Sequence, residues 1–178
     1  LGCDGEGKLQ ALDCRIVMDT GAYASLGGPV FALAMEHAGG PYRIPHASIS
    51  GAVVYTNNPV SGAFRGFGVP QVTAGMEQAM DELAKIAGFD PLSFRLKNAV
   101  RRGDATPAGV VLSTSTGLIP CLERVQQHPL WQEREQWCQG APPLKRRGFG
   151  LAAMYHGIGF GPAIADYANA KLEIGADG

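Results

Sequence analysis

The stretch that decides the fold is NNPVSGAFRGFGVPQ, residues 57–71. Its three glycines allow sharp turns and the close approach of another group, and a single cation, Arg65, stands between Phe64 and Phe67. An apolar run of strand type precedes the stretch and a helical pattern follows it. Because a strand–glycine loop–helix connection presents backbone N–H groups and the positive end of a helix dipole, the stretch predicts a site for an anion.

The same residues also allow a structural interpretation. In that case the glycines only satisfy steric needs, the two phenylalanines belong to the core, and Arg65 pairs with a carboxylate. The stretch matches neither of the two common phosphate-binding patterns, G-x-x-x-x-G-K-[ST] and G-x-G-x-x-G. The residues alone therefore leave a ligand-binding loop and a packing turn both open.

Upstream of this stretch, the pattern predicts two strands and a short helix. Residues 7–23 alternate between apolar and polar side chains and predict a strand, with a bulge near Leu12–Asp13 where the alternation slips. Residues 30–37 predict a helix, with Pro29 suited to its first turn. Residues 48–56 predict a second strand, and because this strand is apolar on both faces, we expect it inside the sheet.

Downstream, residues 70–87 predict the clearest helix of the chain. Their apolar side chains, including that of Ile86, recur with a spacing of three and four, which places Glu77 on the expected solvent side. Asp90 and Pro91 then match the cap and the first position of a second helix.

The remainder of the chain mixes both kinds of element. The pattern predicts helices at 116–126 and 131–138, a linker at 141–143, and strands at 149–158 and 168–174. Since strands and helices occur without a strict strand–helix–strand rhythm, we expect the α+β fold class.

Composition excludes several classes of function. The chain has 178 residues, of which 46% are hydrophobic and 17% charged, which is enough for a real core, and its net charge of -1 argues against a nucleic-acid or membrane surface. No apolar run could span a bilayer and no leader is visible in residues 1–20, so a cytoplasmic location is expected. The scattered cysteines and histidines match no metal-site spacing, which predicts no protein-ligated metal.

Residues 63–71, AFRGFGVPQ, preceded by Asn58-Pro59 and followed by Glu77 and by DELA at 81–84, resemble the molybdenum hydroxylase family. That family contains xanthine dehydrogenases and aldehyde oxidoreductases, and the match is to its large molybdopterin-binding subunit. The resemblance continues through GFDP at 88–91, Arg95, Asn98 and Gly103-Asp104, weakens between 113 and 145, and resumes at 148–161.

The resemblance implies that the chain is a piece of a larger subunit. Residues 1–140 would form part of a first molybdopterin-binding domain, and residues 141–178 a linker and the start of a second. It further implies a molybdopterin cofactor, in the cytosine dinucleotide form if the protein is bacterial, and a hetero-oligomer whose partner subunits or domains carry [2Fe–2S] clusters and FAD. The implied reaction hydroxylates a small molecule, an aldehyde or an N-heterocycle, with oxygen derived from water.

The resemblance also assigns roles to individual residues. It implies that Arg65, with Gly66 and Phe64, contacts the cofactor and that Phe67 stacks on the substrate ring. Phe160, in a second glycine-rich stretch, falls where a second aromatic side chain packs against the substrate.

Two departures from the family's pattern bear on activity. Leu33 occupies the position at which purine-oxidising members carry an arginine, so the resemblance implies that Leu33 is a substrate-binding residue. Leucine cannot hydrogen-bond a purine oxygen, which favours a less polar aldehyde or N-heterocycle as the substrate. The family's catalytic glutamate lies beyond Gly178, so we expect no catalytic residue in this chain and no activity from it alone.

An alternative function is a non-catalytic α+β binding or assembly module. It predicts that Arg65 is paired internally and that Phe67 is buried. The enzyme interpretation instead predicts that both side chains lie together on an exposed concave face.

Overall fold

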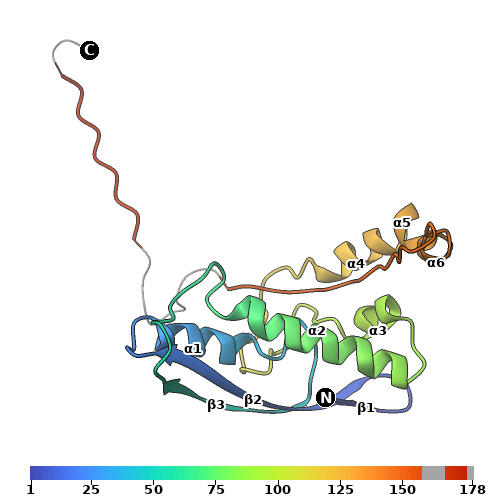
Figure 1. The fold of residues 1–178 in the computed structure, drawn as a ribbon, viewed down its shortest axis with the longest axis horizontal. Coiled ribbons are helices and arrows are strands. Elements are labelled where there is room, and N and C mark those ends of the chain that lie inside the picture. Colours follow the sequence, from blue (N-terminus) through green and yellow to red (C-terminus); the bar gives the residue numbers. More distant parts are fainter. Residues whose placement is uncertain (158–166, 176–178) are drawn as a thin grey trace.

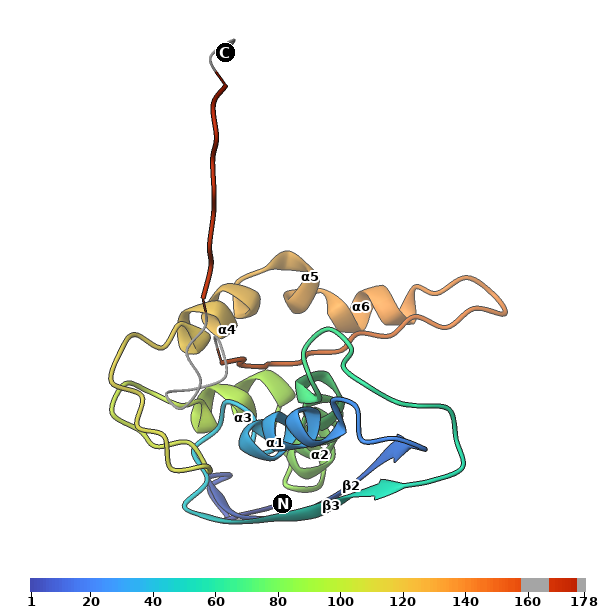
Figure 2. The same cartoon turned by 90° about the vertical axis from the view of Figure 1, so that its left-hand side faces the viewer.

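The computed structural model describes residues 1–157 and 167–175 of the chain. A small sheet is covered on one face by a layer of helices, and a second group of helices lies beyond that layer (Figures 1 and 2). The strands are β1 (Gly2–Cys3), β2 (Leu9–Gly21) and β3 (His46–Tyr55). The helices are α1 (Gly27–His37), α2 (Val69–Ile86), α3 (Pro91–Asn98), α4 (Leu118–Gln126), α5 (Pro129–Gln132) and α6 (Arg134–Gln139). This mixture confirms the predicted α+β class.

The sheet has the order β1-β2-β3, with β1 antiparallel to β2 and β3 parallel to it. Its register shifts in two places: where Gly2 and Cys3 of β1 face Ala11 and Leu9 of β2, just before the bulge predicted near Leu12–Asp13, and between Asp19 and Gly21. The prediction that the second strand lies inside the sheet was wrong, because in the described residues β3 forms an edge and most of its side chains are exposed. In this strand, apolar residues on both faces therefore do not mean that both faces are covered, and one face is exposed.

The main core lies between β2 and the helices α2 and α3. Its buried side chains are Leu9, Leu12, Tyr42, Ile44, Met76, Met80, Ala84, Phe94 and Ala153. A second cluster joins α3 to α4 and α5 through Leu92, Ala99, Leu122 and Trp131. Burying each large apolar side chain stabilises the fold by about 1.5–3 kcal/mol, so these two clusters hold the helical layers together.

The helices after the loop begin where the pattern predicts. The side chain of Asp90 accepts a hydrogen bond from the Ser93 amide at 2.9 Å and Pro91 takes the first position of α3, which confirms the predicted cap. In α2, however, Ile86 is 83% exposed and Glu77 only 5% exposed. The predictions that Ile86 is buried and that Glu77 faces solvent were both wrong. Glu77 is buried because it finds charged and polar partners inside the protein.

The last part of the chain contains no strand among its described residues. Residues 149–157 pass between α2–α3 and α4–α6, and residues 167–175 extend away from the helices (Figures 1 and 2). The strands predicted at 149–158 and 168–174 are therefore not found in the described residues, because no ladder of backbone hydrogen bonds forms there. In the part of the chain described, no helix is long and apolar enough to cross a membrane.

Candidate functional site

The candidate site is the loop between β3 and α2, and the end of β2 anchors its first half. The carboxylate of Asp19 accepts hydrogen bonds from the Thr56 hydroxyl at 2.7 Å and the Asn58 side-chain amide at 2.5 Å. The Ser61 amide donates to the carbonyl of Thr20 at 3.1 Å. Hydrogen bonds from Asn58, then from the Gly21 amide and Thr56, lower the pKa of Asp19, so its charged form holds this half of the loop.

The second half of the loop is fixed by three successive residues with positive φ: Gly66 at 95°, Phe67 at 48° and Gly68 at 87°. A Cβ atom at Gly68 would lie 2.6 Å from the carbonyl oxygen of Val30 in α1, and one at Gly66 would lie 2.6 Å from the ring of Pro70. Only glycine fits these two positions. Both glycines therefore meet steric needs, and Gly68 lets α2 begin directly against α1.

Between these anchors the centre of the loop faces solvent. Phe64 is 79% exposed and Arg65 is exposed, whereas Phe67 is half-buried. Among the described residues, no carboxylate or hydrogen-bond acceptor pairs with the Arg65 guanidinium. The assembly-module alternative required an internal partner for Arg65, so its exposure favours a loop that presents a cation to a ligand.

The loop has only part of the geometry that a closed ligand site needs. A cavity of about 600 Å³ between β2 and the helices α1 and α2 reaches Gly68 and Gln71, but its lining does not include Arg65 or Phe67. A common concave face for these two side chains stays a prediction.

Helix α1 lies against Gly68 of the loop and carries Leu33, another predicted site residue. Leu33 is half-buried on α1, and its carbonyl lies 2.9 Å from Nδ1 of His37. The Nε2 atom of His37 accepts a hydrogen bond from the Gly157 amide at 3.1 Å. Phe160 lies outside the described residues, but the structure holds Gly157 beside the helix that carries Leu33.

The sequence did not reveal a buried network around Glu77 of α2. The Glu77 carboxylate accepts hydrogen bonds from the Tyr42 hydroxyl at 2.5 Å, from Nε of Arg95 at 2.8 Å and from the Ala153 amide at 2.8 Å. Arg95 also pairs with Asp81 at 2.7 Å. Burial, followed by the nearby Glu77 charge, raises the pKa of Tyr42 far above its ordinary value, so its hydroxyl remains a donor.

Arg95 has a structural role in this network, and Asn98 has a separate structural role. Asn98 is 3% exposed, and its side chain binds the amide of Leu9 at 2.8 Å and the carbonyl of Gly7 at 2.9 Å. It thereby ties α3 to the turn before β2. The Arg95-x-x-Asn98 pattern was the available signal, since neither residue type is commonly buried without specific partners.

The loop offers a cation, which suits an anionic group. Within residues 1–157 and 167–175, no group of three or more His, Cys, Asp or Glu side chains lies in an arrangement that could hold a metal ion. Arg65 offers several N–H donors to an oxyanion, and it is exposed at the centre of a loop anchored on both sides.

Comparison with known proteins identifies the family. Residues 1–99 match the model of the molybdopterin cofactor-binding domain, and the chain belongs to this family. It is 38% identical over 177 residues to a probable xanthine dehydrogenase subunit of Bacillus subtilis, covering 99% of this chain and 23% of that protein. It is 46% identical over 126 residues to the nicotinate dehydrogenase large molybdopterin subunit of Eubacterium barkeri, covering 71% and 30%.

A solved structure supports the same assignment. The aldehyde oxidoreductase of Desulfovibrio gigas superposes with a TM-score of 0.72 at 31% identity, covering 79% of this chain and 15% of that one. The α+β arrangement is thus that of part of a molybdenum hydroxylase. The chain spans less than a third of the length of each of these three relatives.

Proposed function

We propose that the full-length protein is the molybdopterin-binding subunit of a molybdenum-containing dehydrogenase, and that residues 57–71 form part of the wall around its cofactor and substrate. One observation carries the proposal. Arg65 is an exposed cation without a partner among the described residues, at the centre of a loop whose two ends are fixed by hydrogen bonds and close packing. The backbone that carries this arginine is therefore in place before an anion binds, while its guanidinium stays free to donate hydrogen bonds.

The loop residues would divide the work of binding. Arg65 donates hydrogen bonds to an oxyanion of the cofactor, while Gly66 and Phe64 shape the backbone and the apolar surface beside it. The bound molybdopterin centre supplies the redox chemistry that adds water-derived oxygen to carbon. Phe67 and, further along the chain, Phe160 would hold a flat substrate in place by stacking.

The proposed substrate is an aldehyde or an N-heterocycle of low polarity. Leu33 is apolar and half-buried on α1, so it can pack against such a molecule but cannot hydrogen-bond a purine oxygen. The proposal includes the cytosine dinucleotide form of the cofactor, a cytoplasmic location, and a hetero-oligomer with partners that carry [2Fe–2S] clusters and FAD. The relatives named as dehydrogenase subunits and as an aldehyde oxidoreductase support it.

The test is the molybdenum content and turnover of the full-length protein, produced together with its partner subunits. We expect Arg65→Gln to lower molybdenum content or kcat by about tenfold, the loss of one charge-assisted hydrogen bond of roughly 1.5 kcal/mol. Phe67→Leu should mainly raise KM across a panel of aldehydes and N-heterocycles.

Arg124→Gln provides the matched control, because Arg124 is an exposed arginine on α4, away from the loop. It should leave both quantities unchanged. If the wild type contains no molybdenum, or if Arg65→Gln behaves like Arg124→Gln, the loop is only a packing turn and the proposal fails.

A further inference from the structure

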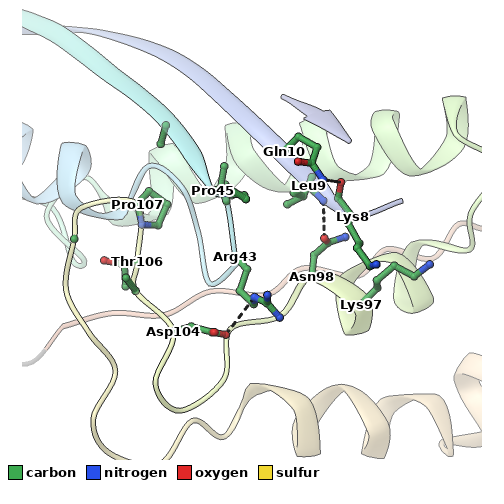
Figure 3. A pocket seen from close by; sticks show the side chains of 14 residues that line it. Lys8, Leu9, Gln10, Arg43, Pro45, Lys97, Asn98, Asp104, Thr106 and Pro107 are labelled. Carbon is green, nitrogen blue, oxygen red and sulfur yellow. Dashed lines mark hydrogen bonds and ion pairs between the residues drawn. The ribbon is translucent and has the colours of Figure 1, made fainter. Parts of the chain in front are cut away.

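A cleft whose lining contains no residue of the loop 57–71 is built from four separate segments (Figure 3). It has a volume of about 610 Å³. Its walls come from the turn and start of β2, the connection before β3, the end of α3 and the loop that follows α3. The residues that face it with charge are Lys8, Arg43, Lys97 and Asp104.

The frame of the cleft is held by buried hydrogen bonds. At the end of α3, the side-chain oxygen of Asn98 accepts a hydrogen bond from the Leu9 amide at 2.8 Å, and its backbone carbonyl accepts one from the Arg43 amide at 2.9 Å. On the opposite wall, Thr106 is 7% exposed and its backbone exchanges hydrogen bonds with Val110 and Gly109. The backbone positions of the charged residues are thus set before any ligand arrives.

Three cations share this cleft with one carboxylate, although the whole chain carries a net charge of -1. The Arg43 guanidinium uses only Nε toward Asp104, at 3.5 Å, and among the described residues its two terminal nitrogens have no partner. Lys8 pairs at 2.7 Å with Glu6, which does not line the cleft. Arg43 is therefore the cation with the most unused hydrogen-bonding capacity.

Lys8 and Arg43 are close enough to influence one another. Glu6 raises the pKa of Lys8, while the charge of Arg43 acts in the opposite direction and lowers it. Lys97 donates to the Glu6 carbonyl and lies over the Phe89 ring, 4.9 Å from its centre. Like charges gathered around an open cleft repel, and an anion placed between them removes that repulsion.

The other end of the cleft is apolar. Pro45 and Pro107 lie on the side away from Lys97 (Figure 3), and Ile44 and Ala47 are further apolar residues of the lining. A bare inorganic anion would leave this surface unused. A ligand with a phosphate at one end and a small apolar group at the other would contact both.

We propose that this cleft binds a small organic phosphate. The phosphate lies against Arg43 with Lys8 and Lys97 nearby, and the organic part lies against Pro45 and Pro107. The site is separate from the loop around Arg65, so it stands or falls independently of the proposed function.

The test is isothermal titration calorimetry of the full-length protein with phenyl phosphate, inorganic phosphate and phenol. Phenyl phosphate should bind most tightly, since only it contacts both ends of the cleft. Arg43→Gln should weaken it by about tenfold and Lys8→Gln by about threefold, because each removes one cation. Asp104→Asn should strengthen binding by about threefold, because it removes the carboxylate that competes for Arg43.

Arg124→Gln, which removes an exposed arginine outside the cleft, should change no affinity. Molybdenum content measured on the Arg43→Gln protein should equal that of the wild type, which separates this site from the loop. The proposal is overturned if phenyl phosphate does not bind, if inorganic phosphate binds equally well, or if Asp104→Asn weakens binding instead of strengthening it.

Discussion

The carboxylate of Glu77 receives groups from three other parts of the chain: the Tyr42 hydroxyl, the Arg95 guanidinium and the Ala153 amide. Its burial makes each of these contacts consequential. A buried ion pair adds little net stability compared with apolar residues, but removing one member leaves the other charge uncompensated. Glu77 is therefore important because its loss would leave the buried charge of Arg95 without its carboxylate partner.

Replacing Glu77 with glutamine should destabilise the fold by about 3 kcal/mol, because Arg95 is fully buried and, among the described residues, would keep only Asp81 as a charged partner. Urea unfolding measures this change. Glu82→Gln on the exposed side of the same helix should stay within about 0.5 kcal/mol of the wild type. Equal effects of the two substitutions would show that the Glu77 network contributes nothing specific.

Asp19 makes the first half of the loop sensitive to pH. Its pKa in the folded protein lies below the ordinary value of 3.8, since Asn58, Gly21 and Thr56 donate hydrogen bonds to the charged form. A lowered pKa means that this anchoring is fully present above 3.8 and is lost as the pH falls through the lower folded-state value.

We therefore expect the Asn58 side-chain amide resonance to shift in acid, with a midpoint below the ordinary aspartate pKa of 3.8. Nuclear magnetic resonance titration follows this signal directly. In Asp19→Asn the shift should disappear, while signals from the distant helix α4 stay unchanged. A midpoint at or above the ordinary value would contradict the hydrogen bonding described here.

At the scale of elements, the start of α2 depends on one glycine. Gly68→Ala should cost about 1–3 kcal/mol, because the residue has a φ of 87° and its Cβ would lie 2.6 Å from the Val30 carbonyl. Gly75→Ala in the same helix meets no atom within 4 Å and should instead stabilise the protein by about 0.5–1 kcal/mol. Thermal unfolding of both variants separates packing from helix propensity, and a loss at both sites would refute the distinction.

Local rules predicted the elements near the loop well. Asp90 and Pro91 set the start of α3, and the spacing of Met76 and Met80 revealed the buried side of α2. The same periodicity misplaced Glu77, because it treats every carboxylate as solvent-seeking. Its partner Arg95 lies on another helix, and no pattern within α2 shows that the two meet.

At the scale of the whole molecule, the errors come from long-range packing. β3 was expected inside the sheet, yet in the described residues it is an edge strand, and Tyr55 is 67% exposed. Residues 149–157 were expected to form a strand, but side chains of Glu77 and His37 hold their backbone instead. The candidate site shows the same contrast between local and long-range features. The exposure of Arg65 agrees with the motif, whereas no residue of the loop itself predicts that Asp19 of β2 anchors it.

The contact between Glu77 and Ala153 also sets an order of events during synthesis. The two residues are 76 positions apart, so Ala153 leaves the ribosome long after α2 has been synthesised. At about 5–20 residues per second the delay is roughly 4–15 s. During that interval the Tyr42 hydroxyl can already donate to Oε1 of Glu77 and Nε of Arg95 to Oε2, and Oε2 keeps a free lone pair for the arriving Ala153 amide. The nascent protein therefore closes its innermost polar contact late, and a translational pause before residue 153 would prolong the open state.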